Sequence, residues 1–433
     1  MKELWLFIAS FLLSFTACYL FIRFNPFGSW AYDPTSGGPQ KFHTKPVPRV
    51  GGLAIFITLL FFSLFEGSYW TLVLCTLPAF LGGLLEDLTK RVGVRERFFL
   101  TMLSGALGYF LLDAYINRVD LPIFDHLLSL SLVSFAFTVF AVGGVANAIN
   151  IIDGYNGLAS GVSLLSLLAL GYVSYLVGDY HLAKLCLLLC CAILGFFLWN
   201  YPSGSIFLGD GGAYLLGFLI AEVSVLLVQR NPEVSPWFPL LVVAYPVVET
   251  LFSIYRRKLL RGTSPGEPDK LHLHTLIYKR LVKVEDKLLR NFMTSPYLWT
   301  LSLLSIIPAV IFWKNTLILI ALFLCFVWVY VWITFGSVHE VRAFRERKKR
   351  SLWFRGLVEN CVVYGDRGYR GCEGVIVCDS REMRAKRQVV EGVISQIKLF
   401  NAGSGWRTLT CVLVYVYAYA IGYSYYRRGE LEV

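Results

Sequence analysis

Long apolar runs recur through most of the sequence and constrain the fold more than any other feature. A helix that crosses a bilayer needs about 20 mainly apolar residues. Eleven candidate runs occur, near residues 4–22, 50–66, 69–85, 98–116, 127–146, 158–177, 182–199, 212–228, 236–255, 296–313 and 316–336. Charged residues make up 16% of the chain, whereas soluble domains carry roughly 25%. The sequence therefore predicts an all-α, polytopic membrane bundle of about eleven transmembrane helices.

Basic residues are distributed unevenly among the loops that join these runs. The loops after the first, third, fifth, seventh and ninth runs carry 18 Lys and Arg residues, whereas the N-terminus and the other loops carry five. Cytoplasmic loops of membrane proteins are enriched in Lys and Arg, so the first set is predicted to be cytoplasmic. Topology then explains the formal net charge of +11, and no nucleic acid partner is required.

The end of the chain differs in composition from the rest. Beyond residue 336 it becomes polar and basic, with strand-like pieces at 361–364 and 374–378. Residues 408–426 are rich in Val, Tyr and Ala, which fits either a further span or β-structure. We therefore divide the chain into a transmembrane catalytic domain, 1–336, and a C-terminal extension of mixed structure, 337–433, that is mostly cytoplasmic.

Polar side chains gather at the ends of the predicted spans, all in the first set of loops. An ionisable or amide side chain at membrane depth is costly and usually functional. The residues concerned are Glu86, Asp87, Asn147, Asn150, Asp153, Asn156, Asp210, His272 and His274. Each has an ordinary alternative, such as a surface ion pair for the Glu86-Asp87 pair or a helix cap for Asp210. Because all these alternatives would have to coincide on one membrane face, a single functional site is the better interpretation.

These residue types favour phosphate chemistry with a divalent cation. Carboxylate and amide oxygens suit Mg²⁺, which often bridges substrate phosphates, and nearby Lys and Arg side chains can neutralise a diphosphate. Zinc is disfavoured, because His272 and His274 are two residues apart and no cytoplasmic cysteine pair has ligand spacing. No ATPase-type phosphate loop or dinucleotide-binding glycine motif occurs. Two other classes stay open: a membrane transporter, and an inactive scaffold for lipid-linked glycan assembly.

Five ordered blocks within residues 1–340 carry a family resemblance. They are KFHTKPVPRVGGLAI (41–55), GLLEDLTKRVGVR (83–95), NAINIIDGYNGLA (147–159), IFLGDGGAYLLGF (206–218) and SPGEPDKLHLHTLI (264–277). The set resembles the polyprenyl-phosphate N-acetylhexosamine-1-phosphate transferases, the membrane superfamily that includes the phospho-MurNAc-pentapeptide translocase. The spaced HLHT is more similar to the N-acetylglucosamine-1-phosphate branch. The pair Glu86-Asp87 departs from the usual Asp-Asp, which puts the role of its first member in doubt.

The resemblance implies an enzyme that transfers a sugar-1-phosphate from a UDP-sugar to undecaprenyl or another polyprenyl phosphate and releases UMP. It implies a plasma-membrane location with a cytoplasmic active site, a role in starting envelope polysaccharide synthesis, Mg²⁺ or Mn²⁺ as cofactor and, as in many family members, a homodimer. Carried over by motif, Asp87, Glu86, Asp153, His272 and His274 would be catalytic, Asp210 would bind the metal, and Lys41, Lys90, Asn147, Asn150 and Asn156 would bind substrate. Asp87 would act either as a base or as a positioning group.

Overall fold

The structure is a computed structural model that describes residues 4–24, 26–28, 32–33, 46–261, 271–334, 363–365 and 375–377. It divides into two compact units, Met1–Phe335 and Gly336–Val433, each of which is described by itself. In the second unit the described residues form two strands, β3 (Val363–Gly365) and β4 (Val375–Val377), which pair in parallel. They overlap the predicted strand-like pieces 361–364 and 374–378. The segment 408–426 lies outside the described residues, and the division into catalytic domain and extension stays a prediction.

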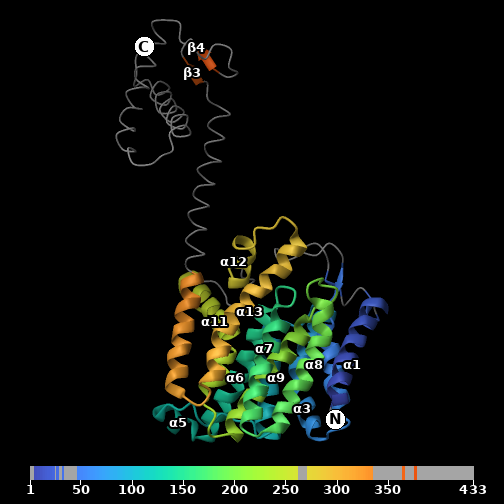
Figure 1. The fold of residues 1–433 in the computed structure, drawn as a ribbon, viewed down its shortest axis with the longest axis vertical. Helices are drawn as coiled ribbons and strands as arrows, with labels where there is room; N and C mark the ends of the chain where they lie inside the picture. The colour runs from blue at the N-terminus through green and yellow to red at the C-terminus, as the bar shows by residue number, and fades with distance from the viewer. Residues whose placement is uncertain are drawn as a thin grey trace. The chain divides into compact units, whose positions relative to one another are not determined.

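The first unit is a bundle of helices (Figure 1). Its elements are α1 (Leu4–Phe24), α2 (Gly51–Ser63), α3 (Ser68–Thr89), α4 (Val94–Leu111), α5 (Pro122–Leu128), α6 (Ser131–Ile152), α7 (Leu158–Leu176), α8 (Tyr180–Asn200), α9 (Gly209–Arg230), α10 (Trp237–Val242), α11 (Ala244–Tyr255), the π-helical turn η2 (Arg256–Arg261), α12 (Leu273–Arg280), α13 (Lys287–Ile311) and a last helix, Thr316–Thr334. Two short antiparallel strands, β1 (Tyr32–Asp33) and β2 (Val47–Pro48), precede α2. Helices occupy every predicted apolar run, which confirms the all-α membrane bundle.

Not every described helix is long and apolar enough to cross a membrane. Eight of the described helices are long and apolar enough to cross a membrane, namely α1, α3, α6, α7, α8, α9, α13 and Thr316–Thr334. Helix α2 has only 13 residues, and the predicted span 236–255 is divided at Val243 into α10 and α11. Proline explains this division, because Pro246 has no N–H to donate to the carbonyl of Val242. The number of eleven spans therefore stays a prediction.

The loops between the helices meet in two separate sets. In the set with many basic residues, Phe207 donates its backbone N–H to the carbonyl of Pro48 (2.9 Å), although 159 positions separate them in the chain. In the other set, the Lys184 ammonium lies 2.7 Å from a carboxylate oxygen of Glu66. The alternation of sides that the basic residues predict therefore agrees with the loop contacts. Which set faces the cytoplasm stays a prediction.

Helix α9 lies at the centre of the bundle. A stretch of 18 of its residues is entirely buried, and it packs against α2, α3, α4, α6 and α7. Its first turn contacts neighbouring main chains, because glycines of three helices meet there. A Cβ on Gly52 would lie 2.1 Å from Cα of Gly212, and a Cβ on Gly83 would lie 2.4 Å from the backbone nitrogen of Gly211. No side chain fits at these positions, so direct main-chain contact fixes the start of α9.

Replacement of Gly52 by alanine should therefore destabilise the bundle. The added Cβ would overlap the backbone of Gly212, which cannot move like a side chain, and we expect a loss of at least about 1–3 kcal/mol. Thermal unfolding of the detergent-solubilised protein measures it. Gly144→Ala in α6 is the matched control, since a Cβ there meets nothing within 4 Å. Equal unfolding midpoints for the two variants would contradict the main-chain contact.

Candidate functional site

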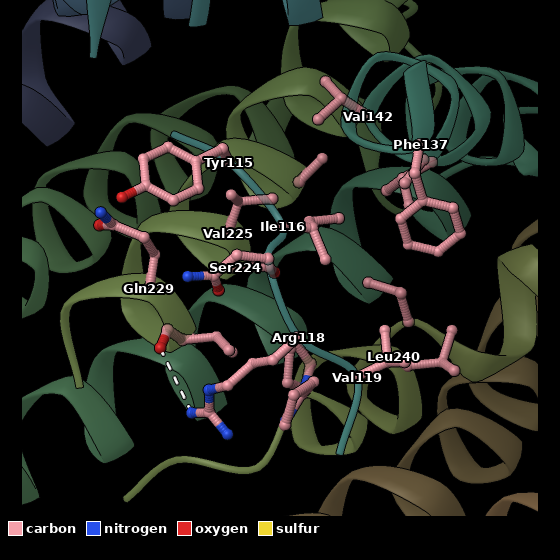
Figure 2. Close-up of a pocket in the computed structure, with 18 residues that line it drawn as sticks. Tyr115, Ile116, Arg118, Val119, Phe137, Val142, Ser224, Val225, Gln229 and Leu240 are labelled. Carbon is pink, nitrogen blue, oxygen red and sulfur yellow. Dashed lines mark hydrogen bonds between the residues drawn. The ribbon is translucent and has the colours of Figure 1, made fainter. Parts of the chain in front are cut away.

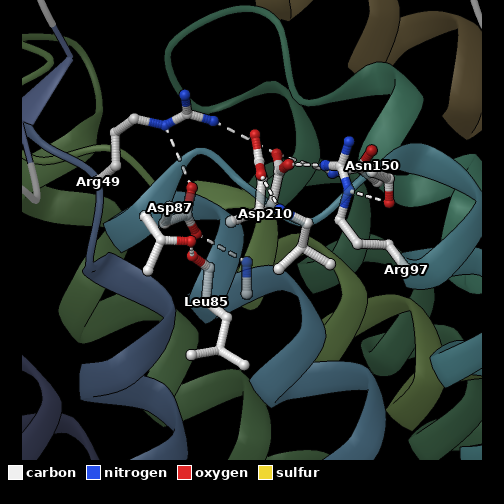
Figure 3. Close-up of polar contacts among 11 residues, drawn as sticks. Arg49, Leu85, Asp87, Arg97, Asn150 and Asp210 are labelled. Carbon is white, nitrogen blue, oxygen red and sulfur yellow. Dashed lines mark hydrogen bonds and ion pairs between the residues drawn. The ribbon is translucent and has the colours of Figure 1, made fainter.

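A cluster of charged and amide side chains surrounds the first turn of α9 (Figure 3). Asp210 is the second residue of α9, Asp87 lies in the last turn of α3, and Asn150 lies in the last turn of α6. Arg49 comes just before α2, and Arg97 is in the first turn of α4. Because α3, α4 and α6 all pack against α9, helix ends that are far apart in sequence deliver these five side chains to one place.

Asp210 is the centre of this cluster. Its Oδ1 accepts a hydrogen bond from Nδ2 of Asn150 (3.1 Å) and lies 3.3 Å from Nη2 of Arg49, while its Oδ2 pairs with Nη1 of Arg97. Nε of Arg49 also lies 3.3 Å from Oδ1 of Asp87, so one guanidinium bridges two carboxylates. Two cations facing two carboxylates give a cluster that is close to electrically balanced.

The two carboxylates differ in their access to solvent. The Asp87 side chain is 1% exposed, whereas that of Asp210 is 18% exposed. Oδ2 of Asp87 accepts a hydrogen bond from the backbone N–H of Gly211 (2.9 Å), one of the first-turn donors that a helix leaves without an internal partner. Asp87 therefore anchors the start of α9 through this hydrogen bond, and Asp210 is the carboxylate that a ligand can reach.

Asp153 and Lys90 belong to the same electrostatic environment. Asp153 follows α6, and burial together with the negative charge of Asp210 raises its pKa to about 8. Lys90 directly follows α3 and has a left-handed backbone conformation (φ 57°). Burial and the charge of Arg49 lower the pKa of the Lys90 ammonium, although Asp87 and Asp210 oppose this effect. These residues lie close enough to the cluster to change the charge that a ligand meets.

The two predicted histidines form a second group that adjoins the first. Nδ1 of His272 lies 2.9 Å from Oε1 of Glu249 in α11, and the rings of His272 and His274 stack with their centroids 5.1 Å apart. A Cβ on Gly154 would lie 3.4 Å from Nε2 of His274. The histidine motif therefore lies against the turn that carries Asp153, and this turn connects it with the cluster around Asp210.

Glu86 and Asn147, two of the predicted site residues, make structural contacts. Oε2 of Glu86 accepts a hydrogen bond from the backbone N–H of Val92 (2.9 Å), which closes the loop between α3 and α4. Nδ2 of Asn147 donates to the carbonyl of Gly143 (2.8 Å) within its own helix. Both side chains thus have local partners, and their predicted catalytic and substrate-binding roles stay predictions.

Asn156 also has a structural environment. Its backbone N–H donates to Oδ1 of Asn291 (2.9 Å), and its Nδ2 donates to the carbonyl of Pro202 (3.0 Å). These bonds tie the loop after α6 to the loop after α8 and to α13. Its predicted role in substrate binding stays a prediction. Lys41, predicted to contact phosphate, lies outside the described residues.

Sequence reasoning did not assign three residues that the structure places in these groups. Arg49 and Arg97 contribute only to the topology signal, although Arg49 lies in the first family block, two residues before its glycine pair. Glu249 interrupts the apolar run 236–255. A carboxylate inside such a run is costly and makes a candidate functional residue, so a signal for Glu249 was present in the sequence.

An apolar cavity of about 180 Å³ lies near the other end of α9 (Figure 2). Val142, Val225 and Leu240 are among its lining residues. Arg118 lies at its edge, but that guanidinium donates to the backbone carbonyl of Val234 (2.7 Å) and is used structurally. Asp210 lies in the first turn of α9, whereas this cavity adjoins the last turns of the same helix. The cavity is therefore separate from the cluster around Asp210.

The raised pKa of Asp153 makes stability depend on pH. An Asp with a folded-state pKa of about 8 and an unfolded value near 3.9 resists ionisation in the folded state, so it lowers stability progressively as pH rises from about 4 to 8. Asp153→Asn cannot ionise, and its unfolding midpoint should exceed that of the wild type by a few degrees at pH 8, with the difference decreasing toward pH 5. Thermal unfolding without added ligand, at several pH values, measures this.

The matched control for this prediction is Asp113→Asn. Asp113 is exposed, on the other side of the bundle, and has a left-handed backbone (φ 53°) that asparagine tolerates. Because this side chain is exposed, its replacement should leave the unfolding midpoint close to that of the wild type at every pH measured. A lower midpoint for Asp153→Asn at pH 8 would show that Asp153 is stabilised as a carboxylate.

Comparison with known proteins places the chain in a family. Residues 69–228 match the glycosyl transferase family 4 model. A Thermotoga maritima protein named undecaprenyl-phosphate alpha-N-acetylglucosaminyl 1-phosphate transferase is 31% identical over 244 residues, 56% of this chain and 72% of the relative. A probable undecaprenyl-phosphate N-acetylglucosaminyl 1-phosphate transferase of Bacillus subtilis is 30% identical over 54% of this chain and 66% of the relative. A phospho-N-acetylmuramoyl-pentapeptide-transferase of Staphylococcus carnosus is 28% identical over 55% and 79%.

The matched share of the Bacillus subtilis relative, 66%, is just under two thirds of its length. The family match itself runs from α3 to α9 and includes Asp87, Asn150 and Asp210. It therefore covers the helices α3, α4, α6 and α9, which contribute residues to the cluster around Asp210. By these similarities the chain belongs to the glycosyl transferase 4 family of polyprenyl-phosphate N-acetylhexosamine-1-phosphate transferases.

Proposed function

We propose that the protein transfers a sugar-1-phosphate, such as N-acetylglucosamine-1-phosphate, from a UDP-sugar to undecaprenyl phosphate or a similar polyprenyl phosphate. An oxygen of the lipid phosphate forms a bond to the β-phosphorus of the UDP-sugar. The bond from that phosphorus to the bridging oxygen breaks, and UMP leaves with the electron pair. The products are a polyprenyl-diphospho-sugar and UMP. The names of the relatives support this reaction.

The observation that carries the proposal is the arrangement around Asp210. Two carboxylates, one amide and two guanidiniums meet at one end of a bundle of apolar helices. A polyprenyl phosphate keeps its chain in the hydrocarbon and its phosphate at the membrane surface, where a water-soluble nucleotide can also arrive. A polar, partly exposed cluster at the helix ends is the place where two such substrates can meet.

Positioning and charge stabilisation do most of the work in phosphoryl transfer. Arg49 and Arg97 supply planar guanidiniums that suit phosphate oxygens, and both already lie beside Asp210. His272 and His274 approach from the adjoining turn and would donate hydrogen bonds to the same phosphates. Asp87 is buried and bonded to the start of α9, which favours positioning over direct proton abstraction as its role.

The carboxylates of the cluster also fit a divalent cation. No group of three or more His, Cys, Asp or Glu side chains suited to a metal occurs within the described part of the chain. Mg²⁺, however, is commonly bound by one or two carboxylates, with waters and substrate phosphates completing its coordination. Asp210, the accessible carboxylate, would hold the cation, with Asp87 behind it. When bound, the cation would neutralise charge on the departing UMP.

The location of the site follows from the same proposal. The loops that carry the cluster are those rich in Lys and Arg, and such loops are usually cytoplasmic. We place the site at the cytoplasmic face of the plasma membrane, where UDP-sugars are made. The basic residues of this face would also attract two anionic substrates.

Release of UMP is the direct test of the proposed function. Purified protein in detergent, given a UDP-N-acetylhexosamine, undecaprenyl phosphate and Mg²⁺, should release UMP and form one lipid-linked sugar per UMP. Removal of the divalent cation with EDTA should abolish turnover, and added Mg²⁺ should restore it. A panel of UDP-sugars identifies the donor. No release from any UDP-N-acetylhexosamine would exclude the function.

Of the three acids Glu86, Asp87 and Asp210, the two aspartates should be essential for turnover and Glu86 should be dispensable. Asp87→Asn and Asp210→Asn should each lower kcat by about 10²–10³, the usual loss when one preorganised electrostatic group is removed. Glu86→Gln should keep at least a tenth of wild-type turnover, because its described contact closes a loop. Steady-state UMP release, with thermal unfolding as the control for folding, measures all three. Equal losses for Glu86→Gln and Asp87→Asn would return Glu86 to the site.

A further inference from the structure

Glu249 is a carboxylate for which the reaction proposed above has no role yet. It lies in α11, and its side chain is completely buried (0% exposed). Oε1 lies 2.9 Å from Nδ1 of His272, and both carboxylate oxygens lie 3.2 Å from the backbone nitrogen of Leu273. Burial of a carboxylate is costly unless it is paired and hydrogen-bonded. Glu249 meets that condition through the residues that begin the histidine motif.

These contacts determine which nitrogen of His272 carries a proton. An ionised carboxylate only accepts hydrogen bonds, so Nδ1 of His272 must be protonated when it bonds to Glu249. The hydrogen bond made by one ring nitrogen sets the state of the other. Nε2 is then the ring nitrogen that remains for a ligand, and the ring can rotate only by breaking the bond to Glu249.

The orientation of His272 extends to its neighbour. The rings of His272 and His274 are stacked, with an interplanar angle of 16°, and Nε2 of His274 lies beside Gly154. A change in the angle of the first ring would therefore displace the second ring relative to the turn that follows α6. Glu249 is thus placed to fix both rings from a single buried position.

We propose that Glu249 is a positioning residue, which holds His272 as the Nδ1–H form and directs its Nε2 toward the phosphate groups of the substrates. This role rests on the proposed function, because it assumes that the histidines engage the substrate. Glu249 does not touch the reacting atoms. It acts through His272, as a carboxylate behind a catalytic histidine does in other enzymes.

A purely structural role makes a different prediction. Leu273 is the first residue of α12, so its N–H has no partner within the helix. Glu249 accepts that N–H and would stabilise the start of α12 whatever the chemistry of His272. Under this alternative, replacing Glu249 would weaken the helix by the same amount whether or not His272 were present.

A double-mutant cycle separates the two roles. Glu249→Gln should lower kcat by about 10- to 100-fold, the usual effect of removing a partner that orients a ligating histidine. His272→Asn should also be slow, and asparagine keeps a good residue at the start of α12. In the His272→Asn background, Glu249→Gln should change turnover by less than about twofold. Losses that multiply would overturn the proposal.

Glu222→Gln is the matched control for burial. Glu222 in α9 is 1% exposed, and its carboxylate has no hydrogen-bond partner among the described residues. Within the described part of the chain it makes no polar contact with His272 or His274, so its replacement should keep turnover within about twofold of the wild type. Thermal unfolding of all variants in detergent reports whether each one is folded.

Nitrogen-15 NMR of protein labelled at its six histidines tests the proposal without any turnover. The signal that disappears in His272→Asn identifies His272, and in the wild type it should show the proton on Nδ1. Glutamine at 249 would give its oxygen to the N–H of Leu273 and turn its amide N–H toward the ring, so Glu249→Gln should move the proton to Nε2. An unchanged tautomer would overturn the proposal. If the wild type released no UMP, the proposed function would fail, but the tautomer result would still decide whether Glu249 orients His272.

Discussion

Direct contact between main chains at the start of α9 is the constraint on which the site depends. Gly52 donates its N–H to the carbonyl of Leu208 (2.8 Å), and Asp87 accepts the N–H of Gly211 (2.9 Å). Asp210 lies between these two anchors. Its carboxylate is therefore directed by backbone atoms of three helices, which cannot relax as side chains do. The glycines beside Asp210 serve this helix contact.

Charge balance explains why acids can be buried at the end of a membrane bundle. A carboxylate as deeply buried as Asp87 would be costly alone, but Arg49 bridges it to Asp210. Arg97 completes the arrangement on the far side of Asp210. Ion pairs of this kind are weak evidence for stability, and their value here is geometric. The same guanidiniums that balance the acids are in position to bind phosphate oxygens.

The sequence predicted the apolar helices, the side of the bundle that holds the site, and the motifs that meet there. Hydropathy and charge bias are local signals, so they could be read without coordinates. The contact partners of each motif depend on packing between helices that are distant in sequence, so the sequence alone does not predict them. Asn150 and Asn147 look alike in sequence, yet only Asn150 contacts Asp210. Arg49 and Arg97 appeared as topology signals because their partners lie 161 and 113 positions away.

The segment 150–156, at the end of α6 and just after it, connects the cluster around Asp210 with the histidine motif. Asn150 bonds to Asp210 at one end of it, and Gly154 adjoins His274 at the other. Asn156 then ties the segment to the rest of the bundle. Because one short stretch of chain contacts both groups, neither can move far without the other. A reaction that joins two anionic substrates needs this kind of rigidity, since misplacement by about 1 Å can cost roughly 10²-fold in rate.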